Sequence, residues 1–513
     1  MRVLKNNENI ACMKATDTID NRQTLHERGV CVVIPTYNNA STIARVVADV
    51  KQYCLDIIVV DDGCTDGTKN ILSTIDGITV VTHPENQGKG TALKSGFRKA
   101  LEMGFSYVIT LDADGQHYGS DINNFLEANK KHPGAMIVGS RRLEGVDRSK
   151  GSSFANKFSN FWYYVQTGRN LADTQTGYRL YPLRKLVGLS LLTSRYEAEL
   201  ELLVFASWHG VEIISIPVDV YYPPREERVS HFRPGMDFFR ITVLNTVLCF
   251  LAVVYGLPCR IFRFFMKYVR TMYSLLFFLF FSMVVITPLV WIYIKVGKMT
   301  ERKRQGLHKL IYHVARFITI HHGIPGTKFR SKVADGVDFG KPHVIICNHQ
   351  SHLDLMAQLV FTPNIVFLTK DWVWNNPFYG LLIRNAEYLP VVDGIEALLP
   401  HLRSLVDRGY SIAVYPEGTR SKDCSIGRFH QGAFYIAEQL GLDILPMYLY
   451  GPGKILPKKS YHLNRGTIQI DVDKPISRQE LEAMGDTMAQ ARTLRHIYKR
   501  RYEQMTNKIE QYV

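Results

Sequence analysis

Short apolar runs alternate with helix-like segments through the first part of the chain, from about residue 30 to residue 140. The apolar runs are CVVIP (31–35), DIIVV (56–60), ITVV (78–81), YVITL (107–111) and AMIVGS (135–140). Between them, segments such as 41–51 and 91–103 carry apolar residues at helical spacing. Buried strands that alternate with helices predict a mainly parallel sheet covered by helices on both faces. We therefore expect an α/β domain in this region.

A second α/β region begins near His343. Its expected strands are VIIC, IVFL, SIAVY and DILPMYLY, and its expected helices include 395–407 and 431–440. Residues 488–512 form a charged, helix-like segment in which we find no candidate chemistry. The pattern thus predicts two α/β domains in one chain.

The most apolar part of the sequence lies between these regions. Residues 241–259 and 271–294 contain no charged side chain. Each segment is long enough to cross a bilayer, which takes about 20 residues. A buried core helix is the alternative for both, favoured more for the first because Asn245 and Thr246 lie inside it.

Basic residues flank both apolar segments. They are Arg233, Arg240, Arg260, Arg263, Lys267, Arg270 and the basic residues of 295–304. A two-pass hairpin would place a strongly basic loop on the outside, against the positive-inside tendency. We instead expect segments that lie in, or re-enter, the cytoplasmic face of an inner (plasma) membrane. The basic groups would then meet anionic headgroups, and both flanking domains would be cytoplasmic.

Length and charge agree with this division. The chain has 513 residues, enough for two cores. We expect a polar lead-in at 1–28 without a signal peptide, a first domain at 29–235, membrane-associated helices at 236–300 and a second domain at 301–513. The net charge of +15 suits anionic lipid or phosphorylated substrates, and no motif supports nucleic-acid binding. The eight cysteines lack CxxC or zinc-finger spacing, so we expect reduced thiols.

Polar clusters follow three strands of the first predicted sheet, at the edge where open parallel sheets bind ligands. They are Pro35 and Tyr37 after the first strand, Asp61, Asp62 and Asp66 after the second, and Asp112, Asp114 and Gln116 after YVITL. Two carboxylates one residue apart can share a divalent cation, and oxygen ligands suit Mg²⁺ or Mn²⁺. A cation held there would neutralise a diphosphate leaving group. A solvated acidic turn is the alternative for any single cluster.

These clusters, with four further strings, resemble the family-2, GT-A-fold glycosyltransferases over about residues 30–234. The strings are HPENQGKGTALKSGF (83–97), VGSRR (138–142), DTQTGYRLYP (173–182) and ELELLVFASWHGVEIISIPVDVYY (199–222). Within that family the sequence is most similar to polyprenyl- (dolichyl-) phosphate mannosyl- and glucosyltransferases. The resemblance implies a Rossmann-like GT-A domain that takes a sugar from a nucleotide-sugar.

The resemblance also implies roles for individual residues. The nucleotide-sugar donor would be bound by Pro35, Tyr37, Asp61, Asp62, Lys89 and Asp112, with Asp62 at the base. The metal would be held by Asp112, Asp114 and Gln116. Arg141 would face the phosphates as a catalytic residue, and Glu201 would stand near the acceptor.

Two positions depart from this family pattern. Gln175 stands where a small residue is more usual, and the second basic residue expected after Arg141 is either Arg148 or Lys150. The acceptor is therefore left open as a lipid phosphate or another lipid-like group. A phosphate acceptor needs no general base, and for a hydroxyl acceptor we identify no candidate base.

The second region carries an HxxxxD pair in CNHQSHLD (347–354), where the VIIC strand ends. Positions five apart do not share a helical face, so His349 and Asp354 meet only if a turn intervenes. The carboxylate could then hold one ring nitrogen while the other takes a proton from a hydroxyl. The alternatives are a pair of solvated polar residues, or His352 as the partner of Asp354.

Further motifs follow HxxxxD in order. YPEGTRS (415–421) forms a glycine turn whose backbone N–H groups and Arg420 suit a phosphate or carboxylate. GRFHQGAFYIA (427–437) and DILPMYLYG (443–451) come next. This order resembles glycerolphosphate and lysophosphatidate acyltransferases over about residues 275–476, and implies their α/β fold.

By that resemblance His349 is the general base and Asp354 orients it. Glu417, Gly418, Thr419 and Arg420 would bind the acceptor's polar head, and the acyl donor would be acyl-CoA or acyl carrier protein. The family's second motif departs: in RNAEYLPVVDG (384–394) Glu387 appears where an arginine normally helps bind glycerol phosphate. This departure favours a sugar or another hydroxyl acceptor.

The preferred hypothesis is a bifunctional, membrane-associated enzyme of glycolipid or lipid-conjugate synthesis. Its first domain would transfer a sugar to a lipid-type acceptor, and its second would esterify a hydroxyl with a fatty acyl group. One alternative is an acyltransferase whose first domain is only a binding module, which the intact acidic clusters disfavour. Another is a non-enzymatic membrane scaffold, which explains the charge but not two sets of catalytic motifs.

Overall fold

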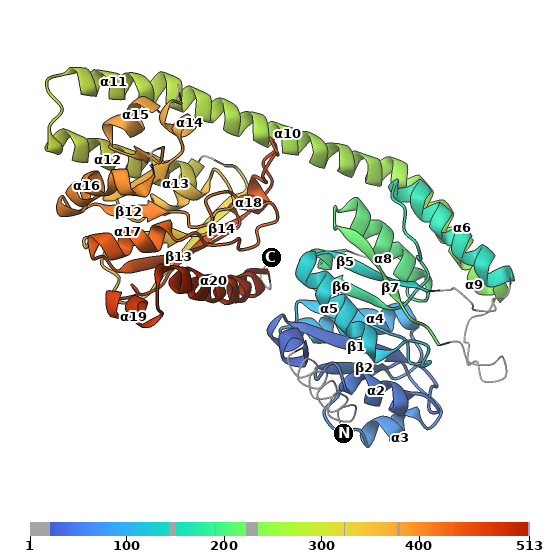
Figure 1. The fold of residues 1–513 in the computed structure, drawn as a ribbon. Coiled ribbons are helices and arrows are strands. Elements are labelled where there is room, and N and C mark those ends of the chain that lie inside the picture. Colours follow the sequence, from blue (N-terminus) through green and yellow to red (C-terminus); the bar gives the residue numbers. More distant parts are fainter. Residues whose placement is uncertain are drawn as a thin grey trace, which may run out of the picture. The chain divides into compact units, whose positions relative to one another are not determined.

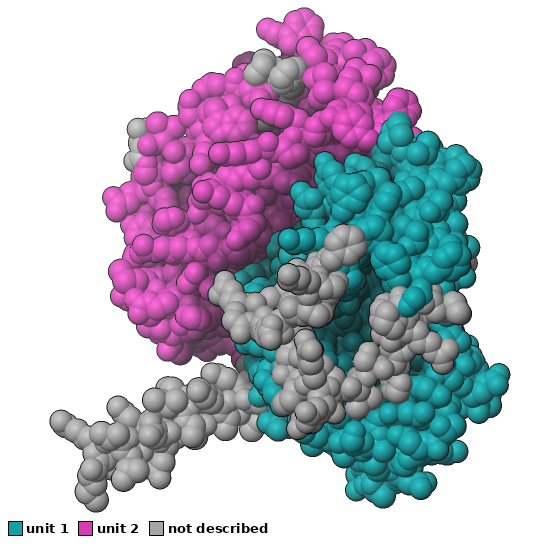
Figure 2. Space-filling view, turned by 90° about the vertical axis from the view of Figure 1, so that its right-hand side faces the viewer, with its two compact units in different colours: residues 1–263, 507–513 teal, residues 264–506 magenta. Residues whose placement is uncertain are grey.

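The computed structural model describes residues 21–142, 150–189, 191–221, 234–322, 324–376, 380–392 and 394–510. The chain divides into two compact units, Met1–Arg263 with Asn507–Val513, and Phe264–Thr506 (Figure 2). Most of the expected polar lead-in lies outside the described residues, as does Arg148. The domain boundaries expected at residues 235 and 300 stay predictions.

The first unit is built on a seven-stranded sheet in the order β3-β2-β1-β4-β6-β5-β7 (Figure 1). Its strands are β1 (Val30–Thr36), β2 (Ile57–Asp61), β3 (Thr79–Thr82), β4 (Tyr107–Thr110), β5 (Met136–Arg141), β6 (Arg179–Pro182) and β7 (Ile213–Val218). All neighbours are parallel except β6, which runs antiparallel to β4 and β5. The five strands expected from the apolar runs are confirmed, and the parallel core is as predicted.

Helices cover both faces of this sheet. They are α2 (Ile43–Lys51), α3 (Thr68–Ser73), α4 (Lys89–Glu102), α5 (Ile122–Lys131), α6 (Lys150–Thr167), α7 (Leu183–Leu186) and α8 (Glu197–Trp208). Alternate side chains of β1 enter two separate cores, because successive strand residues point to opposite faces. One core also takes apolar side chains of α2 and α5, and the other takes those of α4 and α8.

The second unit has its own seven-stranded sheet, in the order β11-β10-β12-β9-β13-β14-β8. Its strands are β8 (Thr327–Val333), β9 (Val344–Cys347), β10 (Ile365–Thr369), β11 (Leu389–Pro390), β12 (Ser411–Val414), β13 (Ile444–Tyr450) and β14 (Gly466–Val472). The central β9 is parallel to β12 and β13. The four expected strands are confirmed, whereas β8, β11 and β14 were not predicted. β8 is mostly exposed and rich in charge, and β11 has only two residues, so neither gives an apolar run.

The helices of the second unit are α12 (Glu301–Arg316), α13 (Asp354–Gln358), α14 (Asp371–Trp374), α15 (Gly380–Asn385), α16 (Ile395–Asp407), α17 (Gly432–Leu440), α18 (Pro452–Ile455), α19 (Arg478–Ala483) and α20 (Thr487–Glu510). They include the three expected ones, α16, α17 and α20, at close to the predicted bounds. The hydroxyl of Tyr498 in α20 donates to the carbonyl of Ile346 in β9 at 2.8 Å. The C-terminal helix is therefore anchored on the strand that leads to His349.

The two apolar segments belong to one helical run, and no turn separates them. The run passes through α9 (Pro234–Leu251), α10 (Leu257–Phe280) and α11 (Thr287–Lys295), joined by short π-helical stretches at 252–256 and 281–286. Within it, Phe238–Lys295 is long and apolar enough to cross a membrane, and little of it is buried. This corrects the expectation of separate re-entering segments. The basic residues between the segments lie on α10 itself and not in a loop.

Close packing of α4 on the first sheet yields a test. A Cβ at Gly96 would lie 2.5 Å from a methyl of Val33 and 3.3 Å from one of Val60. Gly96→Val should therefore push α4 off the sheet, at a cost of roughly 1–3 kcal/mol for overpacking. Hydrogen exchange of peptides that cover β1 and β2 should be faster than in the unsubstituted chain. Arg98→Ala, an exposed change on the same helix, is the control. Equal exchange in both variants would contradict the packing argument.

Candidate active sites

The polar clusters of the first unit come together at one edge of its sheet. β1 is parallel to both β2 and β4, so the carboxyl ends of these three strands lie side by side. Pro35 lies in β1, and Tyr37 follows that strand. Asp61 ends β2, and Asp112 follows β4 by two residues. The structure thus brings the three predicted clusters to a single edge, as expected of parallel strands.

Asp62 holds the loop that leads into α4. Its side chain is buried, with Oδ1 accepting from the backbone N–H of Gln87 at 3.0 Å and Oδ2 from that of Gly88 at 2.9 Å. Oδ1 also lies 2.7 Å from His83 Nδ1. These bonds place Lys89, the first residue of α4. Contact of Asp62 with a nucleotide base stays a prediction.

Lys89 forms the centre of an ionic cluster. Its Nζ lies 2.6 Å from Asp112 Oδ1 and 2.9 Å from Glu199 Oε2. Burial would lower the pKa of Lys89, but the two carboxylates outweigh it and raise the pKa. Burial likewise opposes ionisation of Asp112, and the adjacent Lys89 ammonium holds the pKa of Asp112 below its ordinary value. Lys89 and Asp112 are therefore both charged at neutral pH.

Asp114 and Gln116 complete the acidic turn. Burial and the charge of Asp112 raise the pKa of Asp114 to about 6, which records the repulsion between two neighbouring carboxylates. Among the described residues no group of three His, Cys, Asp or Glu side chains forms a metal cluster. Mg²⁺ is commonly bound by one or two carboxylates together with substrate phosphates. The pair Asp112 and Asp114 fits such a cation, with oxygen-only donors and repulsion that a cation would relieve.

Arg141, at the end of β5, is held by a residue that the sequence analysis did not single out. Its Nε lies 2.6 Å and its Nη2 3.0 Å from the two carboxylate oxygens of Asp173, a bidentate pair. Nearby, the wholly buried Arg179 donates to the backbone carbonyls of Thr174, Thr176 and Glu199. The DTQTGYR string thus forms a fixed loop beside the acidic turn. The side chain of Lys150, the alternative second basic residue, lies outside the described residues.

The two glutamates of the ELEL string have different environments. Glu201 accepts from the backbone N–H groups of Leu192 and Thr193 at 2.5 and 3.0 Å, and from the Thr193 hydroxyl at 2.6 Å. Glu199 faces Lys89 instead. Residues two apart on a helix point about 200° apart, so only one of them can face the site. Glu199 was not singled out from the sequence, and the acceptor role of Glu201 stays a prediction.

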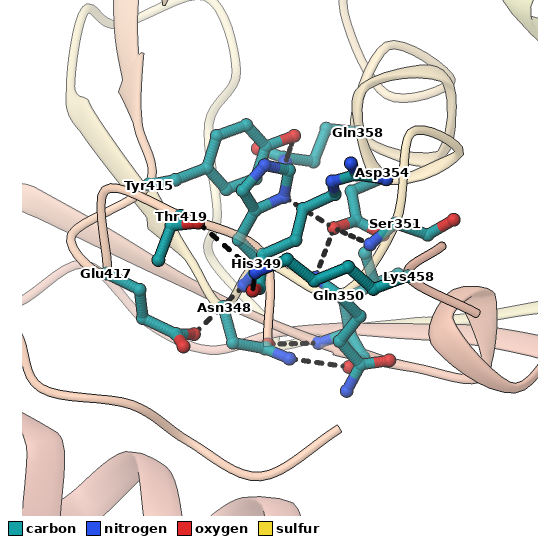
Figure 3. A network of polar contacts seen from close by, with 12 residues as sticks. Asn348, His349, Gln350, Ser351, Asp354, Gln358, Tyr415, Glu417, Thr419 and Lys458 are labelled. Carbon is teal, nitrogen blue, oxygen red and sulfur yellow. Dashed lines mark hydrogen bonds and ion pairs between the residues drawn. The ribbon is translucent and has the colours of Figure 1, made fainter. Parts of the chain in front are cut away.

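In the second unit the predicted His349–Asp354 pair is formed (Figure 3). His349 follows β9, and its Nδ1 lies 2.8 Å from Asp354 Oδ2. The same oxygen accepts from the N–H groups of Gln350 at 2.6 Å and Ser351 at 2.9 Å, which is the intervening turn that the spacing required. Because an ionised carboxylate only accepts, Nδ1 carries the proton and Nε2 is the basic nitrogen. The rival, His352, packs edge-on against Trp372 instead.

The PEGTRS turn is bonded directly to this pair. Glu417 accepts from the His349 N–H at 3.0 Å and, with its other oxygen, from the Gly427 N–H at 2.9 Å. The Ser421 N–H donates to the His349 carbonyl at 2.8 Å. Burial raises the pKa of Glu417. Gly418 adopts a left-handed conformation, with φ of 63°, which turns Thr419 toward the site (Figure 3).

Glu387, the departure from the family's second motif, belongs to a separate ionic network. Its oxygens lie 3.3 Å from Arg304 and 2.7 Å from Arg408. Arg408 in turn lies 2.6 Å from Glu301. The acidic side chain is therefore neutralised between helices and contributes no unpaired negative charge.

Comparison with known proteins finds a family match within each unit. The family model described as glycosyl transferase family 2 matches residues 31–186, and that described as acyltransferase matches residues 327–450. A polyprenol monophosphomannose synthase of Mycolicibacterium smegmatis is 31% identical over 39% of this chain and 79% of its own length. A UDP-N-acetylglucosamine–dolichyl-phosphate N-acetylglucosaminyltransferase of Methanococcus voltae is 29% identical over 38% of this chain and 86% of its own length.

The second unit has its own relatives. A chloroplastic 1-acyl-sn-glycerol-3-phosphate acyltransferase of Brassica napus is 34% identical over 28% of this chain, which spans 44% of that relative. The solved structure of a 1-acyl-sn-glycerophosphate acyltransferase from Thermotoga maritima is 20% identical. It covers 47% of this chain and 98% of its own chain, with a TM-score of 0.40. The first unit belongs to glycosyl transferase family 2. The second unit is similar to acyltransferases over residues 327–450.

Proposed function

We propose that this chain is a bifunctional, membrane-associated enzyme of glycolipid or lipid-conjugate synthesis. One unit would transfer a sugar from a nucleotide-sugar, and the other would esterify a hydroxyl with a fatty acyl group. The observation that carries the proposal is the presence of two formed sites in one chain. These are the Lys89–Asp112–Glu199 cluster beside Asp114, and the His349–Asp354 pair beside the PEGTRS turn.

Sugar transfer would take place at the edge of the first sheet. Mg²⁺ or Mn²⁺ bound by Asp112 and Asp114, with Gln116 beside them, would neutralise the diphosphate leaving group. Pro35, Tyr37, Asp61 and Asp62 would line the nucleotide site. Lys89 and Arg141 are cations near this edge, and their carboxylate partners fix their positions for the donor phosphates.

The acceptor would attack the anomeric carbon from the face opposite to the leaving nucleotide, which inverts the configuration. The relatives named above act on polyprenol or dolichyl phosphate. We propose an acceptor of this lipid-phosphate class. An ionised phosphate oxygen is already a nucleophile and needs no general base. Glu199 Oε1 is buried without a hydrogen-bond partner among the described residues, so it is placed to accept from a sugar hydroxyl.

Acyl transfer would use His349 as the general base. Nε2 would remove the proton of the acceptor hydroxyl as its oxygen attacks the thioester carbonyl of acyl-CoA or acyl carrier protein. Asp354 would keep the ring in the required tautomer and stabilise the imidazolium that forms. The C–S bond then breaks, and His349 returns the proton to the departing thiolate. Gly418, Thr419 and Arg420 would bind the acceptor's polar head.

The apolar helical run would hold the enzyme at an anionic membrane. An α-helix rises about 1.5 Å per residue, so Phe238–Lys295 exceeds the ~30 Å thickness of a bilayer core. Its basic residues on α10 would lie at the headgroups. A single crossing would put the two units on opposite sides, so we propose that the run lies in the cytoplasmic face of the inner (plasma) membrane and does not cross it. Both units are then cytoplasmic, where nucleotide-sugars and acyl thioesters are available.

Separate loss of the two activities is the main test of the proposal. Asp114→Asn should abolish sugar transfer, because it removes one of two charges offered to the metal, while His349-dependent acylation continues. His349→Ala should do the reverse. Mass spectrometry of lipids from cells that express each variant would identify both products. An unchanged lipid profile in both variants would refute bifunctionality, and a change only with His349→Ala would make the first unit a binding module.

Metal removal should affect one activity alone. Chelation with EDTA should stop sugar transfer by the purified chain, and added Mg²⁺ or Mn²⁺ should restore it. Acyl transfer should be unchanged, since no step assigned to His349 and Asp354 needs a cation. Sugar transfer that persists in chelator would contradict the role given to Asp112 and Asp114.

The two ELEL glutamates should respond differently to substitution. Glu199→Gln should lower sugar transfer roughly 10- to 100-fold, the loss expected when a charged hydrogen-bond partner of Lys89 is removed. Glu201→Gln should mainly destabilise the 192–193 loop, by about 1–3 kcal/mol, because buried N–H groups lose their acceptor. Initial rates, together with hydrogen exchange of residues 191–197, distinguish the two effects. A larger catalytic loss with Glu201→Gln would reverse the assignment.

A further inference from the structure

A loop outside the matched acyltransferase segment reaches the His349 site. Residues 456–465 connect α18 to β14 and lie beyond residue 450, where the family match ends. The hydroxyl of Ser351 donates to the Leu456 carbonyl at 3.0 Å. Lys458 Nζ donates to the Arg420 carbonyl at 2.5 Å and lies 3.4 Å from Thr419 Oγ1. The loop therefore contacts both acyltransferase motifs, and Lys458 lies beside His349 in Figure 3.

The backbone of this loop is fixed from both sides. The Asn464 N–H donates to the Ile455 carbonyl at 2.8 Å, and the Ser460 N–H to that of Pro457 at 2.9 Å. From α10, Arg270 Nη2 donates to the Leu463 carbonyl at 2.8 Å. Lys458 thus projects from an anchored segment, and little ordering is needed for it to bind a ligand.

The charge of Lys458 is not cancelled by a neighbouring acid. Across the described residues no carboxylate forms an ion pair with it, and the two acids of the site have other partners. Glu417 binds the N–H groups of His349 and Gly427, and Asp354 binds His349 and its turn. An ammonium has three donors. Two of them engage Arg420 and Thr419, which leaves one for a ligand.

We propose that Lys458 binds a phosphate group of a substrate beside His349, with the Thr419 hydroxyl and Arg420 as its neighbours. This rests on the proposed acyltransferase function and makes its substrate more specific. Lys458 supplies the positive charge that Glu387, at the position of the family's arginine, does not provide. This assignment favours a phosphorylated acceptor over a neutral sugar hydroxyl. The phosphate belongs either to the acyl acceptor or to the pantetheine-containing donor. In lysophosphatidate it is carried by the carbon next to the one that bears the reacting hydroxyl, whereas in the donor a whole pantetheine arm separates it from the thioester.

Steady-state kinetics of the full chain in detergent separate these sources. Lys458→Gln keeps an N–H donor for Arg420 but removes the charge, Lys458→Arg keeps the charge, and Lys459→Gln is the control on an exposed neighbour. With short-chain lysophosphatidate and palmitoyl-CoA, Lys458→Gln should raise one KM roughly 10- to 100-fold with little change in kcat. Lys458→Arg should largely restore it, and Lys459→Gln should match the parent. The KM that rises, for lysophosphatidate or for palmitoyl-CoA, identifies the phosphate.

Two further measurements complete the test: one uses an acceptor without a phosphate, and the other measures binding to the inactive variant His349→Ala. Monoacylglycerol, which lacks the phosphate, should be used equally by Lys458→Gln and the parent if the acceptor carries the phosphate. A fall in kcat alone, equal for both acceptors and for both Lys458 variants, would mean that Lys458 only holds the PEGTRS turn, and would overturn the proposal.

Calorimetric binding of lysophosphatidate and of palmitoyl-CoA to His349→Ala, with and without Lys458→Gln, does not depend on catalysis. If both ligands bind the double variant as tightly as they bind His349→Ala, the phosphate assignment is overturned. Suppose instead that the unsubstituted chain transfers no acyl group while one ligand still binds the double variant more weakly than it binds His349→Ala. That result supports the phosphate assignment and refutes only the acyltransferase function.

Discussion

In both sheets a central strand is hydrogen-bonded to a parallel neighbour on each side, β1 between β2 and β4, and β9 between β12 and β13. Parallel strands deliver their carboxyl ends to one edge, where the backbone leaves the ladder and side chains become available to ligands. Asp61 and Asp112 meet at one such edge, and His349 and the PEGTRS turn meet at the other. Each site depends on this pairing, because its residues come from segments about 50 to 70 positions apart that only the sheet brings together.

Acidic residues at these edges divide into two kinds. Asp62, Glu201 and Glu417 are buried and accept from backbone N–H groups, so their charges are compensated by the loops that they hold. Asp112, Glu199 and Asp354 instead engage the side chains Lys89 and His349. The first kind fixes loop geometry, and the second tunes the charge and tautomer of reactive groups.

In the proposed function the membrane would take part in both reactions. Sugar transfer to a lipid phosphate and acyl transfer to a phosphorylated acceptor would each bring a soluble donor to a substrate anchored in lipid. The basic groups of α10 and the anchored loop 456–465, which Arg270 links to α10, connect the helical run to the His349 site within one unit. This link is a physical reason to find the phosphate-binding lysine on that loop.

The sequence by itself determined the two α/β domains, nine of the strands and the members of each catalytic motif, because apolar periodicity and motif spacing are local properties. It also determined that His349 and Asp354 need a turn between them. Tertiary structure decided which of two candidate residues forms each ion pair: Glu199 and not Glu201 pairs with Lys89, and His349 and not His352 pairs with Asp354. It also showed that Glu387 is neutralised by Arg304 and Arg408, that the apolar segments are one helical run, and that Lys458 lies beside a motif 38 residues earlier. These outcomes depend on helix facing, ion pairing and long-range contact, which spacing along the chain does not encode.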